Sequence, residues 1–244
     1  MITGITSTET AMSMTLLRME VLANNLANIN STGFKKDLLF QEMLDEASDP
    51  AAPDVDAATF TYMVDFSDGP LQATGNTLNL ALEGRGFFAV STPEGTRYTR
   101  NGNFTIALDG TIVTQAGYPV QGVQGVLHVP DPQRTDRSKI VVSEQGEIAL
   151  GTQPIGKLRI VDFPNLGVLK KTEQSLFAAD PLSPVIEKTD LSTRVRQGYL
   201  EGSNVDGLRE MIDMVELVRT FEAEQKVVQA LDATTAQALD VGRV

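Results

Sequence analysis

The sequence predicts an α+β protein with a helix at each end of the chain and an antiparallel β-rich domain between them. Near both ends, apolar residues recur at alternating steps of three and four, which is the spacing of a heptad seam. In the middle, turn dipeptides separate short strand-like runs. Because both seams have heptad spacing, we expect the terminal helices to form a coiled-coil-like layer.

Residues 1–36 are expected to form the N-terminal helix of this layer. Apolar residues face one side of the predicted helix, and Thr15 is the one polar member of the stripe. The seam positions are Met12, Thr15, Met19, Leu22, Leu26 and Ile29.

Residues 37–75 are expected to be an acidic connector. They hold nine acidic residues and no basic one, and Pro50 and Pro53 lie in the middle. This pattern predicts a short helical extension followed by a solvated loop. A docking surface for a basic neighbour is the alternative. Nucleic acid is not expected as a partner, because phosphate binding needs clustered Lys and Arg.

Residues 76–196 are expected to form the β-rich domain. An apolar run at 87–90 is followed by the turn signal Pro93-Glu94-Gly95, which predicts a hairpin. Asn101-Gly102 and Asp109-Gly110 are tight-turn dipeptides that predict further antiparallel pairing.

Further strands of this domain are expected at 140–142, 147–150 and 157–161, with a turn at 154–156. From residue 166 to residue 196 the polar and proline content rises, which predicts little regular structure there.

Residues 197–244 are expected to hold the C-terminal helix. Its seam begins with Leu208, Met211, Val215 and Val218, and after a register shift continues with Phe221, Val228, Leu231, Thr235 and Ala238. Such a stripe is more often the inner face of an ordinary helical packing. Neither helix has a helical neighbour in sequence, however, so we expect the two ends to pair with each other and with those of other copies.

The sequence shows no arrangement that indicates an enzyme. His128 is the only histidine and reads as a structural residue on a strand, and the chain has no cysteine. Gly84-Arg85-Gly86 lacks the third glycine of a dinucleotide loop. We therefore expect no catalytic, cofactor-binding or metal-binding residues. No apolar run reaches the roughly 18 residues of a membrane span, and the start lacks the features of a secretory signal.

Three blocks of the chain carry distinctive motifs. The first is the signature at 23–35, which reads ANNLANINSTGFK. The second comprises the central stretches 69–76, 80–88 and 98–104, and the third is GYLEGSNV at 198–205 with the helix after it. In these blocks the chain resembles the bacterial flagellar rod and hook proteins, and the resemblance covers the whole chain in order.

This resemblance implies a structural subunit of the periplasm-spanning flagellar basal-body rod, which transmits torque and has no active site. Its implied partners are other copies of itself, neighbouring rod subunits and the flagellar type III export apparatus, which exports such subunits without a cleaved signal peptide. No cofactor and no direct membrane insertion are expected. Within the family, the stretch 65–71 and the short acidic segment before it resemble the proximal rod subunits. A distal rod or hook subunit is the alternative.

The residues expected to mediate subunit assembly are the apolar seam positions and the motif residues beside them. In the signature, the asparagines are expected to bond neighbouring subunits or to cap the helix, and Gly33 to supply a left-handed residue. The set is Met12, Met19, Leu22, Asn24, Asn25, Leu26, Asn28, Ile29, Gly33, Phe34, Ser203, Asn204, Val205, Leu208, Met211, Val215, Val218, Phe221, Val228 and Leu231.

Two other classes of protein stay open at this point. A secreted β-rich binding module would be a stable monomer whose helices are ordered without partners. A hydrolase would need a cleft with two acids of raised pKa. The chain has no Trp and four Tyr, which counts against a sugar-binding cleft.

Overall fold

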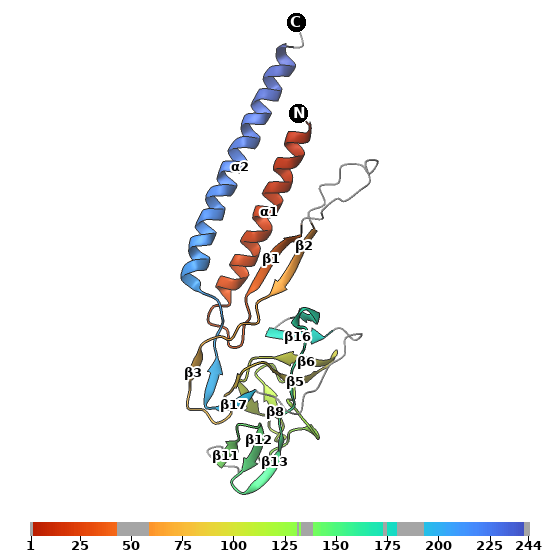
Figure 1. The fold of residues 1–244 in the computed structure, drawn as a ribbon, viewed down its shortest axis with the longest axis vertical. Helices are drawn as coiled ribbons and strands as arrows, with labels where there is room; N and C mark the ends of the chain where they lie inside the picture. Colours follow the sequence, from red (N-terminus) through yellow and green to blue (C-terminus); the bar gives the residue numbers. More distant parts are fainter. Residues whose placement is uncertain are drawn as a thin grey trace. The chain divides into compact units, whose positions relative to one another are not determined.

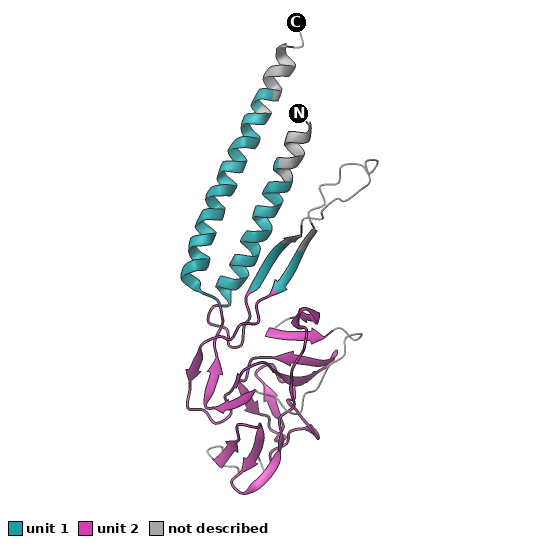
Figure 2. Ribbon diagram, viewed as in Figure 1, with its two compact units in different colours: residues 1–28, 37–63, 205–244 teal, residues 29–36, 64–204 magenta. Residues whose placement is uncertain are grey.

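The computed structural model describes residues 2–42, 59–130, 132, 139–172, 175–179 and 193–241. The chain divides into two compact units (Figures 1 and 2). Unit 1 comprises residues 1–28, 37–63 and 205–244, and unit 2 comprises residues 29–36 and 64–204. Each unit therefore joins segments that are far apart in the sequence.

Unit 1 contains two long helices and a strand pair. Helix α1 spans Ile2–Ala27 and α2 spans Gly207–Val241. They run antiparallel, so that the start of α1 and the end of α2 lie at the same end of the pair (Figure 1). The Asp206 side chain caps α2, because it accepts hydrogen bonds from the backbone N–H groups of Leu208 and Arg209 at 3.1 and 3.3 Å.

The face of α2 that meets α1 differs from the first part of the predicted seam but includes its later positions Phe221, Val228 and Leu231. Glu210 and Glu224 on this face hydrogen-bond Asn25 and Thr15 of α1. Most of the less exposed positions of α2 continue the same stripe at steps of three and four: Gly207, Glu210, Met214, Leu217, Phe221, Glu224, Val228 and Leu231.

The predicted coiled-coil-like layer is wrong. The structure shows one antiparallel helix pair, and the first part of the predicted α2 seam lies open: Leu208, Met211 and Val215 are 69%, 49% and 52% exposed. The physical reason is that α2 carries apolar residues on more than one face, so spacing alone does not select the face that meets α1. The hydrogen bonds of Glu210 and Glu224 lie on the face that meets α1.

Strands β1 (Asp37–Glu42) and β2 (Thr59–Val64) form a two-stranded sheet beside α1. The predicted helical extension after residue 37 is therefore wrong, because these residues pair with β2 instead. Most of the acidic side chains of the predicted connector fall in 43–58, which lies outside the described residues.

The largest sheet of unit 2 has five antiparallel strands in the order β14-β5-β6-β16-β15. The predicted hairpin at 93–95 is confirmed, since β5 and β6 pair with Thr92 opposite Gly95. The strand bounds are β5 Phe87–Thr92, β6 Gly95–Thr99, β14 Ile160–Val161, β15 Leu169–Lys171 and β16 Leu176–Ala179.

Both faces of this sheet are buried, and β5 contributes to each. Phe87 and Ala89 pack in a cluster with Tyr98 and Phe177, whereas Phe88 and Val90 belong to the larger cluster on the other face. Alternate residues of a strand point to opposite faces, so two buried faces require a continuous apolar run. This explains why residues 87–90 are apolar without alternation.

Smaller antiparallel sheets of two or three strands complete the described part of unit 2. The predicted strands around Asp109-Gly110, at 140–142 and at 147–150 are confirmed, but 154–156 is strand rather than turn. The remaining strands are β3 Leu71–Ala73, β4 Leu80–Glu83, β7 Phe104–Ile106, β8 Ile112–Thr114, β9 Gln121–Gly122, β10 Gly125–Val126, β11 Ile140–Val142, β12 Glu147–Leu150, β13 Gln153–Lys157, β17 Arg194–Gln197 and β18 Tyr199–Glu201.

The last two strands return to the beginning of unit 2. Strand β17 pairs with β4, and β18 pairs with β3, with Glu201 opposite Leu71. Strands β15, β16 and β17 and the short 3-10 helix Leu166–Val168 show that the prediction of little regular structure from 166 to 196 is wrong in the described part of that range. Among the described residues, no helix has the length and apolar content of a membrane span.

Candidate functional site

The predicted apolar assembly residues of the helices fall into two groups. The apolar ones of α1 and the later ones of α2 are half-buried: Met12, Met19, Leu22, Leu26, Phe221, Val228 and Leu231. The earlier ones of α2 lie on the surface: Leu208, Met211, Val215 and Val218.

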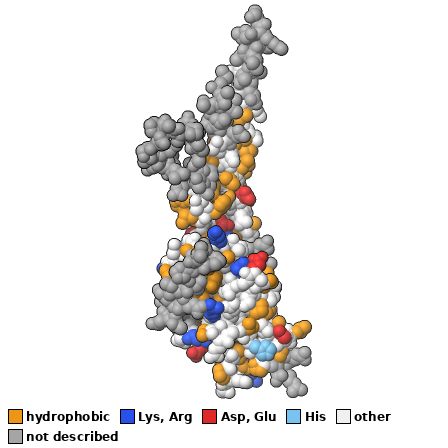
Figure 3. Space-filling model, turned by 90° about the vertical axis from the view of Figure 1, so that its right-hand side faces the viewer, with side chains coloured by type: hydrophobic (Ala, Val, Ile, Leu, Met, Phe, Trp, Pro, Cys, Tyr) orange, Lys and Arg blue, Asp and Glu red, His pale blue; other side chains and the backbone are white. Residues whose placement is uncertain are grey.

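Exposed apolar side chains are frequent in unit 1. Figure 3 shows hydrophobic side chains open to the surface beside polar ones over the helices and the β1–β2 strand pair. The large ones in the described part of this unit are Leu16, Phe40, Tyr62, Met63, Leu208, Met211, Ile212, Val215, Val218 and Val227. A concentration of this kind is typical of a surface that another protein covers.

Asn25 is buried and fastens three elements of unit 1. Its amide exchanges two hydrogen bonds with the backbone of Asp37 at the start of β1, each at 2.9 Å. The same Nδ2 donates to Oε2 of Glu210 on α2 at 3.4 Å. Asn24 is exposed, and Asn28 donates from Nδ2 to the backbone oxygen of Asn24 at 3.0 Å in the last turn of α1.

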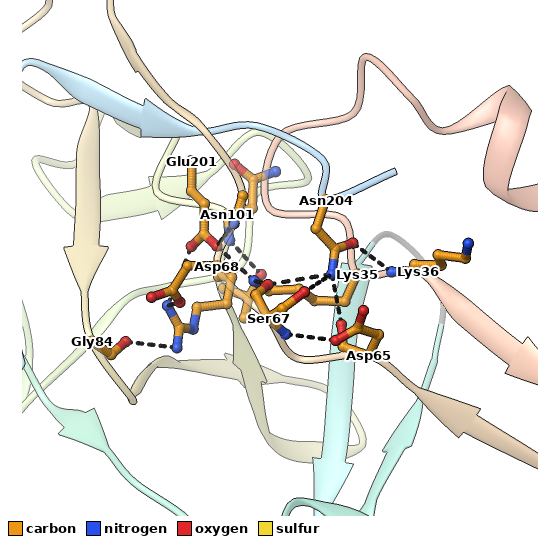
Figure 4. A network of polar contacts seen from close by, with 12 residues as sticks. Lys35, Lys36, Asp65, Ser67, Asp68, Gly84, Asn101, Glu201 and Asn204 are labelled. Atoms are coloured by element: carbon orange, nitrogen blue, oxygen red, sulfur yellow. Dashed lines mark hydrogen bonds and ion pairs between the residues drawn. The ribbon is translucent and has the colours of Figure 1, made fainter. Parts of the chain in front are cut away.

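In unit 2, the end of the signature enters a buried polar cluster (Figure 4). Gly33 has φ +67°, and its N–H donates to the backbone oxygen of Glu201 at 2.7 Å. A Cβ at this position would lie 2.4 Å from the backbone N of Asn101. Glycine is required here on both counts, and the predicted left-handed conformation is confirmed.

Lys35 is fully buried and forms an ion pair with Glu201. Its Nζ lies 2.6 Å from Oε1 of Glu201 and donates to the backbone oxygen of Ser67 at 2.5 Å. Burial lowers the pKa of Lys35 below its ordinary value, although the carboxylate of Glu201 opposes this effect.

Arg100 reaches the same carboxylate from another part of unit 2. Its Nη1 lies 3.3 Å from Oε2 of Glu201 and 3.4 Å from Oδ1 of Asp68, and its Nη2 donates to the backbone oxygen of Gly84 at 2.8 Å. The backbone N–H of Gly69 also donates to Oε1 of Glu201 at 3.0 Å. We call Lys35, Arg100 and Glu201 the Glu201 junction.

Phe34 of the signature and Lys36, the residue after its end, are held beside the junction. The backbone N–H of Lys36 donates to Oδ1 of Asn204 at 2.8 Å, and Nδ2 of Asn204 donates to the backbone oxygen of Asp65 at 2.9 Å. The Nζ of Lys171 lies 3.6 Å from the ring centroid of Phe34, which is buried.

Of the other predicted residues, Ser203 in unit 2 and Val205 in unit 1 are buried, and Ile29 is half-buried. The sequence predictions missed the three charges of the Glu201 junction as site residues. The available signal was that each charge lies inside one of the three blocks that resemble the flagellar family.

The described residues contain no cluster of three or more His, Cys, Asp or Glu side chains that could hold a metal ion. A cavity of about 320 Å³ is lined by Thr99, Asn101, Thr114, Gln115, Ala116, Tyr118 and Leu176. None of these side chains is a carboxylate, an imidazole or an amine, and the phenol of Tyr118 is the one titratable group of its described wall.

Three protein-family models match the chain. A flagella basal body rod protein model matches residues 5–35, a flagellar hook protein FlgE/F/G D1 domain model matches 81–150, and a flagellar basal body rod FlgEFG protein C-terminal model matches 196–241. Lys35, Arg100 and Glu201 each lie in a different one of these segments.

Named relatives agree with the family models. The flagellar basal-body rod protein FlgF of Caulobacter vibrioides is 33% identical over 88% of this chain and 87% of its own length. The rod protein FlgG of Agrobacterium fabrum is 33% identical over 91% of this chain and 93% of its own length. FlgF of Escherichia coli is 31% identical over 93% of each chain. The chain therefore belongs to the flagellar basal-body rod protein family, whose members are structural proteins and not enzymes.

Proposed function

We propose that this chain is a proximal rod subunit, similar to FlgF, which assembles with other copies of itself and with neighbouring rod subunits. Relatives named FlgF and FlgG match at the same identity, so overall similarity does not decide between them. The stretch 65–71 and the short acidic segment before it support the proximal assignment. A distal rod subunit similar to FlgG, or a hook subunit, is the alternative.

The observation that carries the assembly proposal is the exposed apolar surface of α2. Leu208, Met211 and Val215 are about half exposed or more in the single chain. Covering such side chains contributes about 25 cal/mol per Å² of apolar area, less the cost of association. Repeated along a filament of many subunits, these contacts would stiffen a shaft that transmits torque.

We assign the predicted assembly residues two roles in this function. Leu208, Met211, Val215 and Val218 would contact neighbouring subunits directly. The half-buried residues, which are the other seam positions and Asn204, and the buried residues Asn25, Gly33, Phe34, Ser203 and Val205 would hold each unit in the shape that presents those contacts. The burial of the second group within the chain supports this division.

Delivery and location follow from family membership as part of the proposal. The subunit would be exported by the flagellar type III apparatus without a cleaved signal peptide, and would take its place in the part of the rod that spans the periplasm. Its contribution to motility is then mechanical.

Complementation of motility tests the position in the rod. The gene is expressed in two strains of its source bacterium, one lacking the proximal subunit and one lacking the distal subunit. Restored swimming in the first strain alone supports the proposal. Restored swimming in the second strain alone would make the chain a distal subunit.

A substitution pair tests the assembly surface. Leu208→Asp places a charge on the exposed face of α2, and Leu108→Asp places the same charge on a 93% exposed turn of unit 2. We expect the first variant to lose motility and recovery in isolated basal bodies, with an unchanged circular dichroism spectrum. The second variant should swim normally. Normal swimming of the Leu208 variant would rule out this face as a subunit contact.

A further inference from the structure

Among the described residues of unit 2, the three charges of the Glu201 junction are the most deeply buried. The side chains of Lys35, Arg100 and Glu201 are 0%, 3% and 1% exposed. Charges removed from water are tolerated only when they are paired and hydrogen-bonded. The junction therefore depends on the presence of all its members.

Glu201 supplies the buried negative charge for both cations. Among the described residues of unit 2 it is the one buried acid. Asp68, the second acid near Arg100, has a side chain that is 58% exposed and lies at 3.4 Å. Water screens a charge exposed to that degree, so Asp68 compensates Arg100 only in part.

Glu201 also joins separate parts of the chain through hydrogen bonds. It accepts from the backbone N–H groups of Gly33 and Gly69. It lies on β18, the last strand of unit 2 along the chain, and follows Lys35 by 166 residues and Arg100 by 101. Both cations therefore precede the anion that neutralises them by a long stretch of sequence.

We propose that Glu201 controls the completion of unit 2. Until β18 docks against β3, closing the sites of Lys35 and Arg100 would bury two positive charges without their common partner. Unit 2 therefore closes cooperatively around its last strand, and a chain in which this strand is missing or misplaced does not reach the native state. This inference concerns folding and does not depend on the rod assignment.

Amide hydrogen exchange on the full-length protein tests this proposal with the isosteric substitution Glu201→Gln. The reporter of the core is the Ala89 amide, which donates to the backbone oxygen of Arg159 at 3.2 Å, and the local reporters are the Gly33 and Gly69 amides. We expect protection at Ala89 to fall by about a hundredfold or more, together with that of the local reporters.

The matched control is Glu83→Gln. Glu83 pairs with Arg196 at 2.9 Å between β4 and β17, where both side chains are partly exposed. This substitution should change protection at Ala89 by less than about fivefold. If Glu201→Gln alters exchange only at Gly33 and Gly69, the junction stabilises only its immediate surroundings and the proposal is overturned.

A triple substitution separates charge from packing. Lys35→Met, Arg100→Met and Glu201→Met together remove every charge of the junction and keep long side chains in place. Because apolar replacement of a whole buried ionic cluster is often close to neutral, protection at Ala89 should return to within about tenfold of the wild-type value. A triple variant as unprotected as Glu201→Gln would show that charge compensation is not what completes unit 2.

Discussion

Units 1 and 2 differ in the partners of the acidic side chains that lie at their internal contacts. In unit 1, Glu210 and Glu224 face α1, where the hydrogen bonds between the helices come from the neutral side chains of Asn25 and Thr15. One carboxylate oxygen of Glu224 is buried and has no hydrogen-bond partner among the described residues. In unit 2, Glu201 is neutralised by two buried cations. The acid of unit 2 is thus paired by charge within the single chain, although buried atoms such as Asn79 Oδ1 and Arg100 Nε have no hydrogen-bond partner among the described residues of that unit.

The largest expected effect is the removal of a core ring from unit 2. Phe87 contacts the rings of Phe66, Phe163 and Phe177, with centroids 5.6 to 5.9 Å apart. Phe87→Ala should lower the free energy of unfolding by about 3–5 kcal/mol. Phe221→Ala, at a half-buried position of α2, should lower the free energy of unfolding by clearly less. Urea denaturation followed by near-ultraviolet circular dichroism measures both, and equal losses would contradict the contrast between the units.

A smaller loss is expected when Gly33 beside the Glu201 junction gains a methyl group. Gly33→Ala combines left-handed backbone strain with a clash against the backbone of Asn101, so we expect a loss of about 2–3 kcal/mol. Gly75 has a similar φ of +70° but open space around it. Gly75→Ala should therefore show the strain alone, about 1 kcal/mol, in the same denaturation assay.

Within unit 1, Asn25→Ala should lower the free energy of unfolding by about 1–2 kcal/mol. It leaves the backbone N–H and C=O of Asp37 without their partner and removes the contact to Glu210. Thermal unfolding followed by helical circular dichroism measures this loss. Asn24→Ala, at an exposed neighbouring position, is the matched control and should stay within about 0.5 kcal/mol of wild type. An equal effect of both substitutions would exclude Asn25 as a fastening point.

The smallest expected effect is the pH dependence caused by Lys35. Its pKa is lowered in the folded state by burial, so the unfolded chain binds more protons at pH values between the folded pKa and the ordinary value of 10.5. The free energy of unfolding contributed by this group therefore rises with pH in that window. The difference in stability between wild type and Lys35→Met should shift in favour of wild type as the pH rises toward 10.5. A shift in the opposite direction would mean that the ion pair with Glu201 outweighs burial.

Local patterns account for the elements that the sequence predicted correctly. Pro93-Glu94-Gly95 and Asp109-Gly110 specify tight turns, and their hairpins form as predicted. The strands β15, β16 and β17 were missed because they are short, and because β16 and β17 also pair with β6 and β4, which lie far away in the sequence. Such strands depend on the edge they meet rather than on their own propensity.

The candidate site shows the same division. The motif Gly33-Phe34-Lys35 and the segment around Glu201 stand out in the sequence, but nothing in either segment indicates that Lys35 and Glu201 form a buried ion pair. On α2, apolar residues at 208, 211 and 215 have the spacing of an inner face, yet they are exposed. Spacing specifies which residues share a face but not which face is covered.

By itself, the sequence determined the terminal helices, the main hairpins, the need for glycine at residue 33 and the resemblance to the flagellar rod family. These features depend on residues close together in the chain, whose periodicity and backbone preferences act locally. Only the tertiary structure decided which face of α2 meets α1, where the last strands pair, and that Lys35, Arg100 and Glu201 share one buried site. Those outcomes depend on long-range packing and on the cost of burying charge, which no local pattern encodes.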